Sequence, residues 1–252
     1  MASSLKVEHI EPKMDAGVGR GGRLGMIVLS TDMVTESELA VMTPKTDIAI
    51  SATRIHMENP VTMENLRKHG GDIGAAAALF TDGDIDVYMY VCTSGTIAIG
   101  DDNILKSVRA HSPNAQLTSP MIGAIAGLRA LNASKITFLT PYPDEINESM
   151  AAYLAEKGVT TLRAGSFHID DDREIGRVSP QSIVDAAAAL DHEDAEAIFV
   201  PCASLRMSTI IEEIEERLGK PVVTAHQAML WHALRLVGYT EPINGFGRLM
   251  TI

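Results

Sequence analysis

The sequence predicts an α/β protein with two similar lobes, each a parallel sheet flanked by helices, related by a pseudo-two-fold with the active site in the interlobe cleft. Strand-like and helix-like segments alternate along most of the 252 residues, which is typical of βαβ units and parallel sheets. Both cysteines of the chain end apolar runs that have the composition of buried strands. Cys92 and Cys202 lie 110 positions apart (202 − 92), as do Asp32 and Tyr142 (142 − 32), and this shared offset indicates a doubled unit.

The first half of the chain contains the predicted elements of one repeat. Short apolar runs predict strands at residues 24–29, 47–55 and 85–92. Helical patterns cover residues 35–42, 62–79, 104–110 and 120–131, and a helix is expected to open directly after each cysteine, Cys92 and Cys202. Pro44 and Pro113 end two of these helices, whereas Pro120 begins another, because proline fits only the first turn of a helix.

The second half repeats this alternation. Strands are predicted at residues 135–139, 160–164, 197–202 and 221–224, and helices at residues 144–157, 180–190, 209–218 and 227–237. Gly158 ends the first of these helices, and Ser179 is a good N-cap for the second. We therefore expect a first lobe from residues 24–118 plus about 225–252, and a second lobe from residues 119–224. Residues 1–23 are predicted to be a loose N-terminal leader.

Composition excludes several classes of partner. The formal net charge of −12 argues against nucleic acid and against an anionic membrane surface. No apolar run approaches the roughly 18 residues that span a bilayer, and the polar leader lacks a signal-peptide core, so we expect a cytoplasmic protein with free thiols. Neither cysteine has metal-ligand spacing, and the glycines at 17–22 precede the first strand, the wrong order for a dinucleotide loop. We expect no metal, no cofactor, and a homo-oligomer that acts on a small-molecule carboxylate.

The two cysteines are the strongest chemical signal. A thiol at the carboxyl end of a strand faces a helix N-terminus, where backbone N–H groups favour a thiolate. Two thiols in matching positions suit a paired base and acid that invert a stereocentre next to a carboxyl group. Neighbouring groups are predicted to cradle a carboxylate or an enolate oxygen: Thr93, Ser94 and Gly95 from one lobe, and Ala203 and Ser204 from the other. The competing interpretation is that the cysteines are buried filler.

Several segments resemble the aspartate/glutamate racemase superfamily, within it the maleate cis–trans isomerase and arylmalonate decarboxylase branch. They are YVCTSGT (90–96), VPCASLR (200–206), ITFLTPY (136–142), EIGR (174–177), and PVVT with HQA (221–228). The resemblance covers about residues 24–238. It implies a cofactor-independent isomerase, with Cys92 as nucleophile or base, Cys202 as the partner acid, and Tyr142 as a donor to a substrate carboxylate.

Two positions depart from that branch. The resemblance implies asparagines where this chain has Asp32, after the first strand, and Asp172, before EIGR. An ionised aspartate accepts hydrogen bonds and repels a substrate carboxylate, so these residues suit a substrate with a cationic or N–H donor part. The same departures resemble the ectoine-utilisation branch, whose substrates carry an amidinium beside one carboxylate. The alternative interpretation is that Asp32 or Asp172 points to solvent or caps a helix.

The leading functional prediction is a two-cysteine racemase, epimerase or isomerase of a small carboxylate, with an ectoine-type compound as the specific substrate. The alternatives are a maleate cis–trans isomerase, an arylmalonate-type decarboxylase, and a non-catalytic protein that binds a solute in the cleft. His56 could face the cleft because it follows a predicted strand, whereas His226 is expected to be structural. Arg54 and Arg206 could attract a carboxylate or form ordinary ion pairs.

Overall fold

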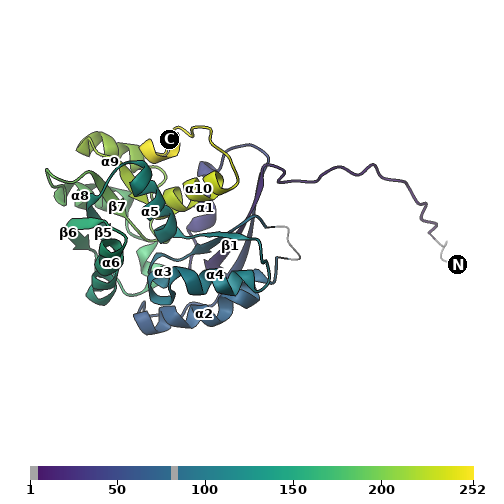
Figure 1. The fold of residues 1–252 in the computed structure, drawn as a ribbon, viewed down its shortest axis with the longest axis horizontal. Helices are drawn as coiled ribbons and strands as arrows, with labels where there is room; N and C mark the ends of the chain where they lie inside the picture. The colour runs from purple at the N-terminus through teal and green to yellow at the C-terminus, as the bar shows by residue number, and fades with distance from the viewer. Residues whose placement is uncertain (1–4, 81–84) are drawn as a thin grey trace.

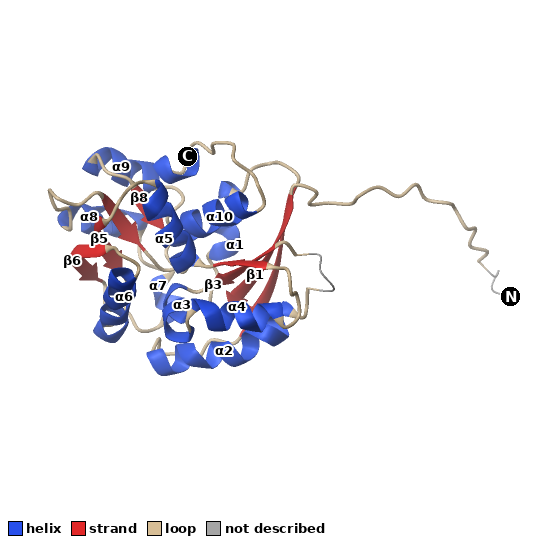
Figure 2. Cartoon of the chain, viewed as in Figure 1, coloured by secondary structure: helices blue, strands red, loops and turns tan. Residues whose placement is uncertain are grey.

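A computed structural model describes residues 5–80 and 85–252 of the chain, and residues 1–4 of the predicted leader lie outside this range. The described part contains two four-stranded parallel sheets, with helices along the faces of both (Figure 2). Residues 5–18 of the leader are exposed and extend away from the body (Figure 1). Within the described residues, no helix combines the length and the hydropathy needed to cross a membrane.

The two sheets have the same strand order, which confirms the prediction of two similar lobes. The first sheet runs β2-β1-β3-β4, formed by Gly22–Leu29 (β1), Ile48–Ile55 (β2), Val87–Val91 (β3) and Gln116–Thr118 (β4). The second runs β6-β5-β7-β8, formed by Lys135–Thr140 (β5), Thr160–Ser166 (β6), Ala197–Val200 (β7) and Val222–Thr224 (β8). Every residue of β3 and β7 is buried, as expected for inner strands of parallel sheets covered on both faces.

The helices follow the predicted positions, with ends that differ by a few residues. Their bounds are Thr35–Met42 (α1), Met63–Ala77 (α2), Thr93–Ile99 (α3), Asp101–Arg109 (α4), Pro120–Ala130 (α5), Asp144–Glu156 (α6), Asp172–Ile175 (α7), Pro180–Ala189 (α8), Ile211–Leu218 (α9) and Ala225–Leu236 (α10), with a final 3₁₀ turn at Arg248–Thr251. The helix expected directly after Cys92 is α3. The helix expected directly after Cys202 is absent, because residues 203–210 form turns and α9 begins only at Ile211.

Three elements were not predicted: β4, α7 and the final 3₁₀ turn. β4 has three residues and α7 has four, which is too short for either periodicity to appear in the sequence. α7 is a single turn that begins at Asp172 and is capped by the side chain of Asp171. This turn matters for the site, because it positions the Asp172 carboxylate in the cavity described below.

The helix that follows the last strand of each sheet, α5 or α10, connects the two lobes. The chain leaves β4 through α5, which contacts β8 of the other sheet, and it leaves β8 through α10, which contacts β3, β4 and α1 as well as β8. α5 and α10 pack against each other, and at Gly123 a Cβ atom would lie 2.5 Å from the carbonyl oxygen of Ala228. The lobe boundaries at residues 118 and 224 stay a prediction, because the contacts of both helices are divided between the sheets.

The close approach at Gly123 yields a stability prediction. Gly123→Ala should lower the free energy of unfolding by about 1–3 kcal/mol, because the methyl group forces α10 away from α5. Urea unfolding measures this change. Gly71→Ala is the matched control: Gly71 lies exposed in α2, nothing lies within 4 Å of its added Cβ, and the change should stabilise by about 0.5–1 kcal/mol. Equal effects of the two substitutions would contradict the packing argument.

Candidate active site

The two cysteines lie just beyond equivalent strands of the two lobes. Cys92 follows β3 and is the N-cap of α3, where its sulfur accepts the N–H of Gly95 at 3.2 Å. Cys202 lies two residues after β7, and its sulfur accepts the N–H of Ser204 at 3.4 Å. The backbone of Cys202 has a φ of +103°, a conformation that costs a non-glycine residue about 1–3 kcal/mol and that clusters at functional sites.

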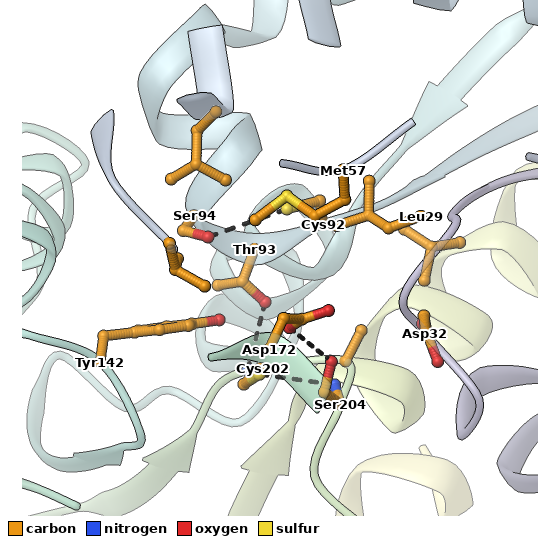
Figure 3. A pocket seen from close by; sticks show the side chains of 14 residues that line it. Leu29, Asp32, Met57, Cys92, Thr93, Ser94, Tyr142, Asp172, Cys202 and Ser204 are labelled. Atoms are coloured by element: carbon orange, nitrogen blue, oxygen red, sulfur yellow. Dashed lines mark hydrogen bonds between the residues drawn. The ribbon is translucent and has the colours of Figure 1, made fainter. Parts of the chain in front are cut away.

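A hydrogen bond joins the two cysteine segments. The backbone N–H of Cys202 donates to the hydroxyl of Thr93 at 3.2 Å, so the end of β7 is attached to the first turn of α3. Both sulfurs line one narrow cavity between the lobes (Figure 3). The lining residues are Leu29, Asp32, Met57, Val61, Leu66, Val91, Cys92, Thr93, Ser94, Tyr142, Asp172, Cys202, Ala203 and Ser204.

The ionisable groups that line this cavity are all acidic. Its lining contains two carboxylates and two thiols but no lysine, arginine or histidine among the described residues. The positive polarity comes instead from hydroxyl and backbone N–H groups around the cysteines, and Leu29, Met57, Val61, Leu66 and Val91 form an apolar wall. A ligand bound here therefore contacts carboxylate acceptors and uncharged hydrogen-bond donors, and no lining side chain that the structure describes supplies a positive charge.

Asp172 lies at the centre of the polar side of the cavity (Figure 3). Its carboxylate accepts the hydroxyl of Thr31 and, at 2.9 Å, the hydroxyl of Ser204. Burial raises the pKa of this carboxyl, and the two hydroxyl donors only partly oppose the effect. The alternative interpretation, that Asp172 points to solvent or caps a helix, is wrong: its side chain is buried, and α7 is capped by Asp171.

Asp32 lies at the edge of the cavity, and its carboxylate oxygens already accept hydrogen bonds from the following residues of the chain. Its carboxylate accepts the N–H of Val34 at 2.8 Å, the N–H of Thr35 at 3.0 Å and the hydroxyl of Thr35 at 2.6 Å. Because the proton of Thr35 goes to Asp32, Nε2 of His226, at 2.8 Å, must donate to the Thr35 oxygen. Asp32 thus supports the start of α1 while lining the cavity, and buried His226 supports Thr35, as expected for a structural histidine.

Tyr142 is buried and lines the cavity, and its hydroxyl partly opposes the rise in the pKa of the Cys202 thiol. Burial raises the pKa of this phenol well above its usual value, with the nearby thiols adding to the effect. The hydroxyl is therefore protonated over the whole physiological range and available as a donor. The predicted role of Tyr142, a hydrogen bond to a substrate carboxylate, stays a prediction.

The two thiols differ in how strongly their ionisation is opposed. Burial raises the pKa of Cys92 to about 11, while the Gly95 N–H and the Ser94 hydroxyl act in the opposite direction. Burial raises the pKa of Cys202 further, and the negative charge of Asp172 adds to it. Cys92 is thus the thiol that ionises more easily, which favours it as the base or nucleophile and Cys202 as the acid.

The other predicted site residues are divided between the cavity and its surroundings. Ser94, Ala203 and Ser204 line it, and Thr93 lines it while accepting from Cys202. Gly95 does not line it: its N–H is directed at the Cys92 sulfur.

The predicted basic side chains lie outside the cavity. His56 is exposed and is absent from the lining. Arg54 donates to the carbonyl oxygens of Leu29 and Asp32 and pairs with Glu36, and Arg206 donates to the carbonyl of Val178.

Sequence reasoning missed the segment that closes the cavity. The connection from β2 to α2 carries Met57 and Val61 into the lining. It reaches the other lobe through the N–H of Val61 to the carbonyl of Asp170 at 2.8 Å, and through the amide of Asn59 to the Asp171 carboxylate at 3.0 Å. An irregular segment carries no periodic signal, so the sequence offered no means of finding it.

Comparisons with known proteins agree with this fold. The family model described as arylmalonate decarboxylase matches residues 102–250. A maleate isomerase from Geobacillus stearothermophilus is 25% identical over 244 residues, covering 91% of this chain and 97% of that protein. A crystal structure of a maleate isomerase variant from Pseudomonas putida S16 with maleate superposes with a TM-score of 0.85 at 22% identity, covering 91% and 97% of the two chains. A Nocardia farcinica maleate cis–trans isomerase mutant with a covalently bound succinylcysteine intermediate gives 0.84 at 24% identity, covering 93% and 98%.

The raised thiol pKa predicts how Cys92 reacts with pH. In Cys202→Ala, carbamidomethylation of Cys92 by iodoacetamide should rise about tenfold per pH unit from pH 7 to 9, because only the thiolate reacts and its fraction grows with pH below the pKa. Intact-mass spectrometry follows the reaction. Cys202 in Cys92→Ala should react more slowly at each pH. A plateau for Cys92 below pH 9 would show an unperturbed thiol.

Proposed function

The chain belongs to the arylmalonate decarboxylase family, and we propose that within it this protein is a cofactor-independent two-cysteine isomerase of a small carboxylate. The observation that carries the proposal is the convergence of Cys92 and Cys202 on one cavity from equivalent strand ends. One sulfur comes from each lobe, so a substrate bound between the lobes has a thiol on each of two sides. That arrangement suits removal of a proton from one face and delivery to the other.

The proposed steps for a substrate with an acidic C–H bond balance as follows. The Cys92 thiolate removes the proton next to the carboxyl group, and the electron pair of the C–H bond passes to the carboxyl oxygens as an enolate. The Cys202 thiol then delivers its proton to the opposite face of the carbon, so that Cys92 ends as thiol and Cys202 as thiolate. The hydroxyls of Ser94 and Tyr142 are the lining donors that suit the developing negative charge, since the Ser204 hydroxyl donates to Asp172.

We propose that the substrate carries a cationic or N–H donor group beside its carboxylate. Asp172 presents a buried carboxylate to the cavity, and the lining described in the structure provides no cation to balance a second substrate carboxylate. A cationic group beside Asp172 would also weaken the negative field that raises the pKa of both thiols. An ectoine-type compound, with an amidinium beside one carboxylate, is the specific substrate that these features favour.

A second candidate is cis–trans isomerisation of maleate. The full-length relatives are maleate isomerases, and one solved structure holds a succinylcysteine, which is a cysteine sulfur added to the carbon skeleton of maleate. The raised pKa of Asp172 supports this candidate, because a protonated Asp172 donates a hydrogen bond to a carboxylate as an asparagine does. In that reaction the Cys92 thiolate adds to the double bond, the bond between the former alkene carbons rotates, and the sulfur leaves.

Proton NMR in D₂O with ectoine, 5-hydroxyectoine, maleate, aspartate and an arylmalonate tests the two candidates. We expect deuterium uptake at a stereocentre of a cation-bearing carboxylate, reduced at least about 100-fold in Cys92→Ala and in Cys202→Ala. Fumarate formed from maleate would replace the leading candidate with the second. Ligand-induced stabilisation without turnover of any compound would identify a solute-binding protein.

Substitution of Asp172 tests the substrate class. Asp172→Asn should lower kcat/KM for a cation-bearing carboxylate about tenfold or more and strengthen the binding of maleate, because the amide donates where the carboxylate only accepts. Isothermal titration and the NMR assay measure both effects. Asp185→Asn, an exposed change of the same net charge beside Arg217, should alter neither. Maleate binding that is unchanged by Asp172→Asn would contradict this role.

A further inference from the structure

Two buried side chains lie behind Cys92 and take no part in the proposed chemistry. Tyr90 precedes Cys92 by two residues, so its side chain leaves the strand on the same side as the sulfur. It has no exposed surface, and its hydroxyl and the Cys92 sulfur both lie against the backbone of Gly95. The hydroxyl also lies 2.9 Å from Nδ1 of His69, a residue of α2 that is 1% exposed.

Gly95 makes this approach to the sulfur sterically possible. A Cβ atom at residue 95 would lie 2.2 Å from the Tyr90 hydroxyl oxygen and 2.9 Å from the Cys92 sulfur. Both distances are far below van der Waals contact, so the oxygen and the sulfur converge on space that any larger residue would fill. The Tyr90 hydroxyl and the Gly95 N–H thus reach the sulfur from the protein side, away from the cavity.

The second ring nitrogen of His69 determines the direction of these bonds. Nε2 is buried and has no hydrogen-bond partner. Burial lowers the pKa of His69 to about 4, so the ring is neutral and carries one proton. A buried N–H without an acceptor costs more than a buried lone pair without a donor, which places the proton on Nδ1. Nδ1–H then donates to the Tyr90 oxygen, and the single proton of Tyr90 is free for the sulfur.

We propose that Tyr90 and His69 are positioning residues for Cys92: His69 Nδ1–H donates to Tyr90, and the Tyr90 hydroxyl donates to the Cys92 sulfur and stabilises its thiolate. This inference rests on the proposed function, since it assigns a purpose to the ionisation of Cys92. It also explains how the thiol with the lower pKa is selected. Cys92 has the Tyr90, Gly95 and Ser94 donors, whereas the donors on Cys202 are Tyr142 and the N–H of Ser204.

Other charged and titratable groups surround the pair. Asp172 and Tyr142 act on Cys92 from the cavity side, together with the second thiol, Cys202. Asp72 of α2, with Glu58 and His56 from the connection between β2 and α2, acts on His69. Cys202 is replaced by alanine in every variant compared below and the other groups are left unaltered, so their fields stay constant across the comparison.

The test uses the full chain with Cys202→Ala, so that iodoacetamide labels Cys92, and it needs no substrate. Tyr90→Phe should reduce the labelling rate about threefold to tenfold at each pH from 7 to 9 and displace the profile by about one unit to higher pH. His69→Leu should reduce it less, because Tyr90 keeps its proton but loses the donor that polarises it. His69→Asn, whose amide nitrogen lies near the position of Nδ1, should restore the rate.

The sign of the His69→Leu effect is the sharpest outcome. If Tyr90 instead donates to His69, removal of the imidazole frees the Tyr90 proton for the sulfur and the labelling rate rises, which would overturn the proposal. An unchanged rate in Tyr90→Phe would overturn it too. Tyr88→Phe is the matched control: Tyr88 lies on the same strand, equally buried, and bonds to Ser112 and Ala77, so its loss should leave the profile unchanged.

Folding and function are separated in this design. The double variant Tyr90→Phe with His69→Leu leaves no unpaired polar atom between the two side chains, so it keeps the test available if Tyr90→Phe unfolds. Circular dichroism checks that each variant is folded. Labelling that follows the expected order while none of the five NMR compounds turns over would retain the positioning pair and reject the proposed function.

Discussion

Burial of two thiols and the Asp172 carboxyl in one cavity, without a lining cation in the described structure, is the constraint on which the rest of the site depends. Each group loses water that would stabilise its charged form, so the pKa of each is raised. A metal or an arginine would have reversed these shifts. The chain instead surrounds the groups with neutral donors, which leaves the protons available for transfer between protein and substrate.

Those donors come from segments that are distant in the sequence. The Asp172 carboxylate receives hydroxyls from Thr31 in one lobe and Ser204 in the other, and the Cys202 N–H donates to Thr93 across the interface. The lobes are therefore joined at the same atoms that shape the cavity. A shift of one lobe against the other would alter both the closeness of the sulfurs and the donors that hold Asp172.

The fold and the two cysteines could be predicted because their signals are local. Apolar runs, proline and glycine positions and the 110-residue offset identify two parallel-sheet lobes, and the strand-to-helix transitions identify the thiols. The apolar wall from Met57 and Val61 could not be predicted, since an irregular connection between β2 and α2 carries these residues across the cleft. Gly95 was predicted to contact the ligand, yet its N–H is directed at a sulfur because the first turn of α3 folds back on its own N-cap.

The sequence by itself determined which chemical groups the site contains: two thiols after strands, and two aspartates where the resembling family implies asparagines. Tertiary structure decided what each group does. The Asp32 carboxylate accepts hydrogen bonds from the start of α1, whereas the Asp172 carboxylate lies in the cavity. It also decided which thiol ionises first, because Tyr90 and Gly95 reach Cys92 while Asp172 opposes Cys202 more strongly. The physical reason is that a pKa depends on burial and on the direction of neighbouring donors, and both are fixed only when distant segments pack together.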